Sequence, residues 1–225
     1  MRNTHLPPKL VLFDLDGTLA DTFKDLLGAL NLALAEHGYE NAEPSRIREL
    51  VSQGAREMSR AALPCGSPDI DSVHQRLLAI YERDVAIRTT LFEGIEQVLD
   101  ALDRVGVRYG VVTNKQARFS EPLIDNLRLR SRLCCLVSGD TARRAKPHAD
   151  PLVLAAKLCG VATTQCVYIG DAHNDVIAAR AANMPVAVAT YGYIGVDEKP
   201  QSWNADALIA QPSDLHDWLQ LPEAA

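Results

Sequence analysis

Short apolar runs alternate along the chain with longer segments in which apolar residues recur every three or four positions. The short runs are rich in β-branched residues and end in polar or turn residues, a pattern typical of buried strands. The longer segments follow the helical period: Ile95, Val98 and Leu102 share one face, and Gly106 is a stop signal. Strands that alternate with helices predict a parallel sheet with helices on both faces. We expect strands within KLVLFD, VRYGVVTN, LCCLVSGD, QCVYIGD, MPVAVAT and DALIA.

One long segment interrupts this alternation. After the first apolar run, the chain shows helical patterns separated by turn residues, and no strand candidate, as far as about residue 88. We therefore expect an all-helical domain inserted into an α/β core. The predicted boundaries are 21–88 for the insertion, and 1–20 together with 89–225 for the core. The insertion would lie over the carboxyl edge of the sheet, where open α/β sheets bind their ligands.

Composition narrows the class of protein. The chain has 225 residues, which suits one large domain or a core with a smaller domain inserted into it. Hydrophobic residues make up 47% and charged residues 23%, so a packed core is expected and extensive disorder is not. The net charge of −6 argues against a nucleic-acid-binding surface, which usually carries a basic excess. An anionic substrate is still compatible, because a local cation or a metal ion can reverse the field.

The five cysteines show neither a C-x-x-C pair nor a Cys/His cluster with the spacing of a zinc site. Cys134 and Cys135 are neighbours within an expected strand, so their side chains should point to opposite faces. The odd number of cysteines and the absence of a leader-like start predict reduced thiols and a cytoplasmic location. No apolar run approaches the ~20 residues that a membrane span needs, so no membrane partner is expected.

Polar side chains directly follow several of the expected strands. In a parallel sheet the carboxyl ends of the strands meet at one edge, so these side chains should converge. Carboxylates at such close range repel, and a group of them is costly to hold without a cation. The residues concerned are Asp14, Asp16, Thr113, Asn114, Lys115, Lys146, Asp171 and Asp175.

A divalent metal ion would relieve this crowding. Mg²⁺ takes carboxylate oxygens and keeps room for waters and a substrate phosphate. The hydroxyl of Thr113 and the ammonium of Lys146 suit phosphate oxygens. A carboxylate nucleophile, an acid/base partner, a metal ion and a cationic clamp together predict a phosphoryl-transfer site. An ordinary Asp-Gly turn could hold Asp14 and Asp16, but it explains none of the other strand-end groups.

The motifs FDLDGTLADT, VVTNK, AKPHADPL and YIGDAHND resemble, in this order, the four motifs of the haloacid dehalogenase superfamily of phosphatases. The helical insertion resembles the cap domain of the first subclass, and the resemblance covers essentially the whole chain. It implies a Rossmann-like α/β core. VTNKQARFSEPL and KPHADPLVLAAKLCGV resemble the phosphoglycolate phosphatase group. LFEG, GAREM and YGYIGVDEKPQSWNAD resemble a related group that dephosphorylates N-acetylmuramic acid 6-phosphate.

The resemblance implies roles for the acidic residues. Asp14 would be the nucleophile that forms an aspartyl-phosphate, and Asp16 would protonate the leaving alkoxide and then deprotonate the attacking water. Both would also bind Mg²⁺, Asp16 through its backbone carbonyl. Asp171 would be the remaining carboxylate on the metal, and Asp175 would hold the metal's water shell. Gly17 would allow the tight turn that aims both aspartates inward.

The resemblance also implies residues that bind the substrate. Thr113, Asn114 and Lys146 would bind the phosphoryl group. In the cap, Arg56 would grip a substrate carboxylate, although most charged residues on helices simply face solvent. Arg118 is an alternative for that contact.

Several polar residues have two interpretations. Lys115 could equally belong to the site or form a surface salt bridge, and Asp175 could cap its own helix. We interpret His173 as a structural residue at a helix start, because Asp16 already supplies the base. Tyr191 and Tyr193 could line the site or pack a loop. His148, close to Lys146 in the sequence, is expected to be structural.

Single residues argue against related activities. A dehalogenase needs no Mg²⁺ site, so Asp16, Asp171 and Asp175 speak against it. A phosphonate hydrolase would use a cap lysine, and residues 25–88 contain none. A sugar-phosphate mutase shares the core residues and stays open as an alternative. A receiver-type signalling module would carry its acceptor on a later strand of a shorter chain, and the complete residue set argues against a protein that only binds.

The expected function is therefore Mg²⁺-dependent hydrolysis of a small phosphate monoester that carries a carboxylate. Phosphoglycolate is the first candidate substrate, and N-acetylmuramic acid 6-phosphate is the second. A monomer and a homodimer are equally compatible with the sequence.

Overall fold

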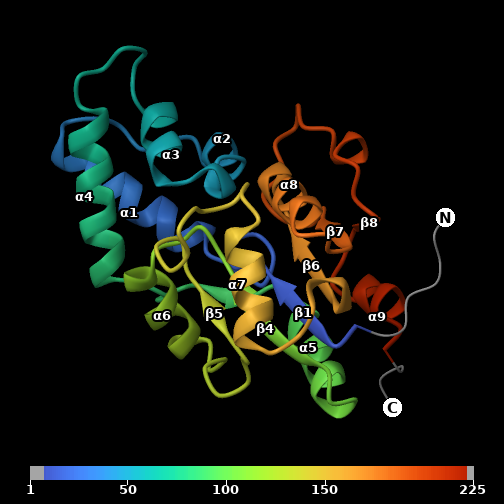
Figure 1. Cartoon of the computed structure of the whole chain (residues 1–225). Helices are drawn as coiled ribbons and strands as arrows, with labels where there is room; N and C mark the ends of the chain where they lie inside the picture. The colour runs from blue at the N-terminus through green and yellow to red at the C-terminus, as the bar shows by residue number, and fades with distance from the viewer. Residues whose placement is uncertain (1–7, 222–225) are drawn as a thin grey trace.

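The computed structural model describes residues 8–221; the ends of the predicted core, 1–7 and 222–225, lie outside the described residues. Six parallel strands form one sheet in the order β5-β4-β1-β6-β7-β8 (Figure 1). They are β1 (Leu10–Phe13), β4 (Arg108–Val112), β5 (Leu136–Val137), β6 (Cys166–Gly170), β7 (Val186–Ala189) and β8 (Ala207–Ile209). Each lies within an apolar run that predicts a strand, so the predicted sheet is confirmed.

Helices cover both faces of the sheet, because successive strand residues point to opposite sides. Val11 and Phe13 of β1 point to one face, and Leu10 and Leu12 to the other. The first face packs against α5, α6 and α9, and the second against α7 and α8. These helices are α5 (Ile95–Arg104), α6 (Ala117–Asn126), α7 (Asp150–Leu158), α8 (His173–Ala181) and α9 (Asp214–Leu219), with short 3₁₀ helices η2 (Thr163–Gln165) and η3 (Pro200–Ser202).

The helices between β2 and β3 pack around a hydrophobic cluster that includes Leu34 and Met58. This cluster continues into the α/β core through Phe119 and Tyr193. In Figure 1 these helices stand together at the upper left, beside the sheet. They are α1 (Phe23–Glu36), α2 (Pro44–Arg48), η1 (Val51–Gln53), α3 (Ala55–Ala62) and α4 (Ile70–Arg83).

The helical pattern over residues 44–63 does not form one continuous helix. The structure divides the segment into α2, η1 and α3. The last break falls at Gly54, whose φ of 100° lies in the region that favours glycine. Because the chain turns here, η1 reaches the core, where the Ser52 hydroxyl donates a hydrogen bond to Asp171.

Two very short strands, β2 (Ala20–Asp21) and β3 (Thr90–Leu91), pair antiparallel where the chain leaves the core and returns to it. The sequence does not predict them, because two residues show no periodicity. Asp25 braces the same place: its buried carboxylate accepts hydrogen bonds from the backbone N–H groups of Arg88 and Thr89 and from the Thr89 hydroxyl. The two connections are therefore held side by side.

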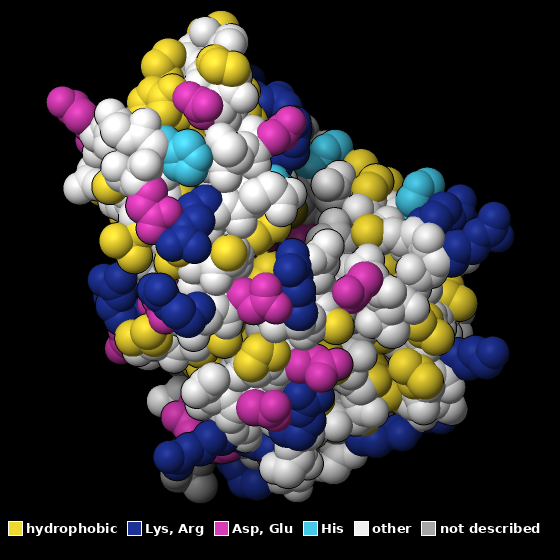
Figure 2. Space-filling model, turned by 90° about the vertical axis from the view of Figure 1, so that its left-hand side faces the viewer, with side chains coloured by type: hydrophobic (Ala, Val, Ile, Leu, Met, Phe, Trp, Pro, Cys, Tyr) yellow, Lys and Arg dark blue, Asp and Glu magenta, His cyan; other side chains and the backbone are white. Residues whose placement is uncertain are grey.

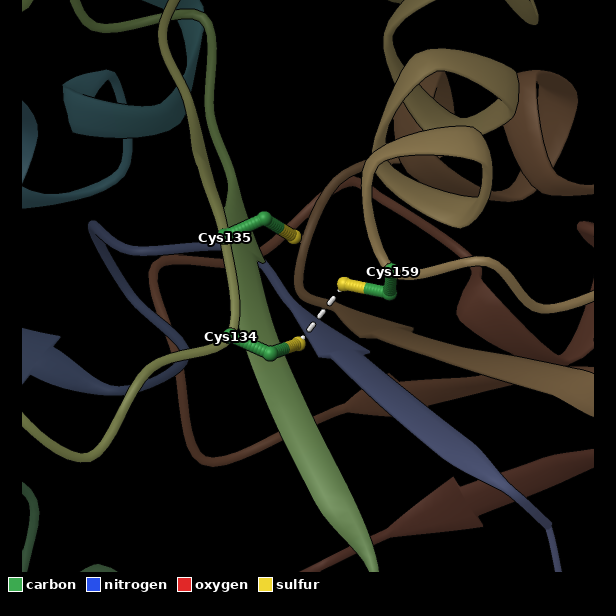
Figure 3. Close-up of side chains that lie close together, drawn as sticks. All are labelled: Cys134, Cys135 and Cys159. Atoms are coloured by element: carbon green, nitrogen blue, oxygen red, sulfur yellow. Dashed lines mark hydrogen bonds between the residues drawn. The ribbon is translucent and has the colours of Figure 1, made fainter.

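The expectation that Cys134 and Cys135 point to opposite faces is wrong. Both residues precede β5, with a bend at Cys134. Figure 3 shows their side chains on the same side, toward Cys159. The sulfur atoms of the three residues lie within 4.8 Å of one another.

The surface carries charges of both signs. On the face shown in Figure 2, basic and acidic side chains are interspersed. The exposed ion pairs of the described residues include Arg76–Glu36 and Arg130–Asp125. Among the helices that the structure describes, none is both long and apolar enough to cross a membrane.

Candidate active site

Residues from separate elements meet at the carboxyl edge of the sheet. Asp14 follows β1, Thr113 follows β4, Asp171 follows β6, and Asp175 lies in the first turn of α8. The carboxylate oxygens of Asp14, Asp171 and Asp175 lie within 4.8 Å of one another, and we call these residues the carboxylate trio. All three are buried, Asp14 with 8% of its surface exposed and the others with 1%. Three carboxylates this close need a compensating cation.

Lys146 supplies a buried cation. Its Nζ lies 2.7 Å from Asp175 Oδ1 and 3.0 Å from Asp14 Oδ1. It also donates to the Tyr168 hydroxyl and to the Val112 carbonyl. Burial by itself lowers the pKa of Lys146, but Asp14 and Asp175 outweigh this and raise the pKa above its ordinary value. One ammonium thus balances two members of the carboxylate trio.

Asp171 is not balanced in this way. Its Oδ2 accepts hydrogen bonds from the Tyr193 N–H and the Ser52 hydroxyl, whereas its buried Oδ1 has no hydrogen-bond partner. Burial and the nearby charges of Asp14 and Asp175 raise the pKa of Asp171 well above its ordinary value. Burial likewise raises the pKa of Asp14 to about 7. Converging carboxylates and a buried oxygen without a donor fit a hard cation such as Mg²⁺.

Asp16 is paired with a different lysine. Lys115 Nζ lies 2.9 Å from Asp16 Oδ1 and 3.2 Å from Oδ2, and the Thr22 hydroxyl donates to Oδ1. Only 9% of the Lys115 side chain is exposed, so this is not a surface salt bridge. Lys115 Nζ also lies 4.7 Å from the ring centre of Tyr81 in α4. Lys115 therefore connects Asp16 to the inserted helices.

Gly17 makes the close approach of these loops possible. Its φ of 80° suits glycine, and a Cβ at this position would collide with the carboxylate of Asp171. The turn after β1 can therefore pack against the loop after β6 only without a side chain here.

Thr113 and Asn114 occupy the end of β4 in different ways. Thr113 is 3% exposed, and its hydroxyl oxygen accepts a hydrogen bond from the Lys115 N–H, which leaves the hydroxyl hydrogen free to donate. The Asn114 side-chain amide donates a hydrogen bond of 3.0 Å from Nδ2 to the Lys146 carbonyl. Its Oδ1 accepts a hydrogen bond of 3.0 Å from the Lys146 backbone N–H. The Asn114 side chain thus positions Lys146.

The two arginines singled out from the sequence face outward. Arg56 lies 2.7 Å from Asp71, and both side chains are exposed on the inserted helices. Arg118 lies 3.2 Å from Glu82 of α4, and both of these are also exposed. The structure does not bring either arginine together with the carboxylate trio.

Two residues that sequence reasoning missed do reach the core. Ser52 Oγ lies 2.8 Å from Asp171 Oδ2. The Arg48 guanidinium lies 4.7 Å from the ring centre of Tyr193 and 3.7 Å from Asp21. Both lie a few positions before Gly54, so this glycine is the sequence signal that could have pointed to them.

The remaining aromatic and histidine candidates have structural contacts. His173 is exposed and stacks on Trp203. The Tyr193 hydroxyl donates to Asp21, and the Tyr191 hydroxyl donates to the Thr18 carbonyl. The tyrosines therefore hold the loop after β7 against the turn after β1. His148, beyond Lys146, is exposed.

Comparison with known proteins identifies the family. The family model described as haloacid dehalogenase-like hydrolase matches residues 11–189, which is most of the chain and includes the residues that follow β1, β4 and β6. The chain belongs to the haloacid dehalogenase-like hydrolases. The carboxylate trio, Lys146 and Asp16 thus lie within the matched part of a haloacid dehalogenase-like hydrolase.

Two relatives extend along nearly the whole chain. N-acetylmuramic acid 6-phosphate phosphatase of Pseudomonas aeruginosa is 37% identical over 213 residues, which cover 94% of this chain and 94% of that protein. Phosphoglycolate phosphatase of Xanthomonas campestris pv. campestris is 39% identical over 209 residues, with 92% and 95% covered. A crystal structure from Haemophilus somnus, named a predicted phosphoglycolate phosphatase, matches with a TM-score of 0.84, 24% identity and 96% and 99% coverage. At that identity the structural likeness is one of fold.

Proposed function

We propose that this haloacid dehalogenase-like hydrolase is a Mg²⁺-dependent phosphomonoesterase that acts through an aspartyl-phosphate on Asp14. The observation that carries the proposal is the carboxylate trio, with Lys146 buried against it and Asp171 Oδ1 left without a donor. Such a site suits a metal ion and a phosphoryl group together. Relatives named as phosphatases, at 37% and 39% identity, support the same reaction class.

The metal would be held by Asp14, Asp171 and the backbone carbonyl of Asp16, with Asp175 on its water shell. When bound, Mg²⁺ would supply positive charge that neutralises the phosphoryl oxygens and draws them toward the nucleophile. The carboxylate and carbonyl oxygens of these residues are the hard ligands that this ion prefers.

Asp14 is oriented for attack through one of its oxygens. The Leu15 N–H donates to Asp14 Oδ1 at 2.7 Å, and Lys146 contacts the same oxygen. Both contacts fix the carboxylate in one rotation and leave Oδ2 for other partners. The Asp14–phosphorus bond forms as the bond from phosphorus to the leaving oxygen breaks, and water then cleaves the aspartyl-phosphate. Thr113 and Lys146 would donate to the phosphoryl oxygens, and Asn114 would keep Lys146 in place.

Asp16 must hold a proton to protonate the leaving oxygen. Here the Lys115 ammonium contacts both of its carboxylate oxygens, at 2.9 and 3.2 Å. We therefore place Lys115 on the phosphoryl group in the substrate complex, so that Asp16 is released to exchange protons. We propose that residues 21–88 act as a cap. Because Lys115 also contacts Tyr81 of α4, movement of this cap would control whether Lys115 pairs with Asp16.

The substrate is proposed to be a small phosphate ester with a carboxylate. We assign that carboxylate contact to Arg48, because its guanidinium reaches from α2 to the ring of Tyr193, whose backbone N–H bonds to Asp171. Only 37% of its side chain is exposed, and its pairing with Asp21 at 3.7 Å is long enough to be exchanged. The prediction from the sequence assigns this contact to Arg56, so the two arginines form a matched pair for testing.

Phosphoglycolate is the first candidate substrate, as in the relative from Xanthomonas campestris pv. campestris. N-acetylmuramic acid 6-phosphate is the second, because the relative from Pseudomonas aeruginosa that bears this name matches 94% of the chain. We also place the protein in the cytoplasm, since all five of its cysteines are free thiols.

The test is phosphate release with Mg²⁺ from both candidate substrates and from an aryl phosphate that lacks a carboxylate. A higher kcat/KM for 2-phosphoglycolate supports the first candidate, and the reverse order supports the second. Release from the aryl phosphate alone removes both substrates and keeps the chemistry. No release from any of the three, at any Mg²⁺ concentration, contradicts the phosphatase proposal.

Arg48→Ala and Arg56→Ala locate the carboxylate contact. Arg48→Ala should lower kcat/KM for the preferred carboxylate substrate by about 10- to 100-fold, the value of a lost charge-assisted hydrogen bond. It should leave kcat/KM for the aryl phosphate nearly unchanged. Arg56→Ala should leave both unchanged; a selective loss in that variant instead would return the contact to Arg56.

A further inference from the structure

Three cysteines from separate elements bring their thiols together away from the carboxylate trio. Cys134 and Cys135 precede β5, and Cys159 is the C-terminal cap of α7 (Figure 3). The Sγ atoms of Cys134 and Cys159 are 2.8 Å apart, and all three sulfur atoms lie within 4.8 Å of one another. We call these residues the thiol trio.

The local backbone is arranged so that both neighbouring thiols face the same way. Consecutive residues of an extended chain normally point to opposite sides. Here the bend at Cys134 turns both side chains toward Cys159, while the Cys134 N–H bonds to the Tyr109 carbonyl and the Val111 N–H bonds to the Cys135 carbonyl. The hydrogen bonds to β4 therefore fix a conformation that an ordinary strand would not adopt.

The neighbouring strand leaves room for the thiols. A Cβ at Gly110 of β4 would collide with Cys135 Sγ. Cys135 and Cys159 belong to the same buried apolar cluster as Leu152 and Val112, and only 8% of Cys135 and 7% of Cys159 is exposed. Cys134 is the more exposed member, so it gives access from solvent. The thiol trio is thus preformed and largely buried, with one side accessible to solvent.

We propose that the thiol trio is a binding site for a soft monovalent metal ion, Cu(I), held by three thiolates. Sulfur ligands select soft ions, and Cu(I) is among those that thiolates favour. A structural zinc ion would need a fourth ligand, and among the described residues the group contains no His, Asp or Glu. Binding transfers no electron: Cu⁺ replaces the thiol protons, which are released to solvent.

The electrostatics of Cys134 assist the first step. Hydrogen bonds from the Cys135 and Cys159 thiols lower the pKa of Cys134 to about 6, and the charge of Arg108 acts in the same direction. Cys134 is also the most exposed of the three thiols and lies at the open side of the thiol trio. It would capture the ion before Cys135 and Cys159 complete the site.

The site is separate from the catalytic edge. Lys146 precedes the amino end of α7, whereas Cys159 caps the carboxyl end of the same helix. Cu(I) would tie this end of α7 to the chain that enters β5. Loading should therefore raise the thermal unfolding temperature and leave turnover of a phosphate ester unchanged.

The experiment uses the full-length chain, reduced and kept free of oxygen. Cu(I) is titrated in competition with a colorimetric Cu(I) chelator, and the bound metal per chain is counted by native mass spectrometry. One ion per chain is expected. Cys134→Ala, Cys135→Ala and Cys159→Ala should each weaken binding by at least about 100-fold, since each removes a direct ligand. Cys65→Ala, which removes an exposed cysteine outside the trio, is the matched control and should bind as the unaltered chain does.

A second measurement does not depend on altered chains. Bound Cu(I) should protect the thiol trio from alkylation, as read by peptide mass spectrometry, while Cys65 stays reactive. The proposal is overturned if the unaltered chain competes for Cu(I) no better than a variant lacking all three cysteines. It is also overturned if Cu(I) protects Cys65 instead, or if the trio yields only a Cys134–Cys159 disulfide and takes up no metal when reduced.

Discussion

The carboxylate trio and the thiol trio lie near opposite ends of α7, and both bury three groups that can bind a metal. They differ in how the buried groups are balanced. The carboxylate trio faces a fixed cation, Lys146, and Asp171 Oδ1 still has no partner. The thiols can stay neutral and hydrogen-bond to one another, so they need no cation at all. We therefore expect the carboxylate trio to need a further cation, whereas the thiol trio can remain neutral without one.

The largest effect is expected for turnover at the carboxylate trio. Asp14→Asn should lower kcat by at least about 10³-fold, because it removes the proposed nucleophile while keeping the size of the side chain. The fold should persist, since burial already opposes the charge that is lost. Phosphate release and thermal unfolding of the same preparation check both points. Near-normal turnover in Asp14→Asn would remove the covalent mechanism.

The next effect is on stability and concerns the fixed cation. Lys146→Met should lower the free energy of unfolding by about 3–5 kcal/mol in the absence of Mg²⁺, because it leaves buried carboxylates unpaired. Added Mg²⁺ should recover part of this loss. Urea unfolding measures it, with Lys157→Met on the exposed side of α7 as the matched control. Equal stability of the two variants would show that Lys146 does not balance the trio.

The pH dependence of the Mg²⁺ effect follows from the raised pKa of Asp14, about 7 against an ordinary 3.8. A raised carboxyl pKa means that the folded protein binds the proton more tightly than the unfolded chain does. This contribution to stability is complete below about pH 3.8 and is lost as the pH rises through about 7. Mg²⁺ compensates the ionised form, so it should raise the unfolding temperature more at about pH 8 than at about pH 5.5. A larger gain at the lower pH would contradict this assignment.

The smallest effect is expected at the thiol trio without metal. Cys135→Ala should lower the free energy of unfolding by about 1 kcal/mol, because a buried neutral thiol contributes as a small hydrophobic group. Cys166→Ala, at a similarly buried position, is its control. A loss at Cys135 as large as that in Lys146→Met would mean that charge, and not packing, holds the thiols together.

The secondary structure of the α/β core could be predicted from the sequence more fully than that of the inserted helices. Its strands are short apolar runs with polar ends, and a parallel sheet brings all carboxyl ends to one edge whatever the details of packing. Asp14 and Asp171 could therefore be placed together before any coordinates. In the insertion, the helical period runs on through Gly54, and nothing in that period marks where the helix breaks.

The sequence by itself determined the six strands of the parallel sheet, the helices that flank it and the polar side chains at its carboxyl edge. Tertiary structure alone decided which side chains cross between elements: Lys115 to Asp16, Ser52 to Asp171, Arg48 to Tyr193 and Cys159 to Cys134. The physical reason is the range of the forces involved. Hydrophobic periodicity indicates which face of each segment is buried. Contacts between residues far apart in the chain depend on bends, short strands and close approaches at glycines, which only the packed molecule defines.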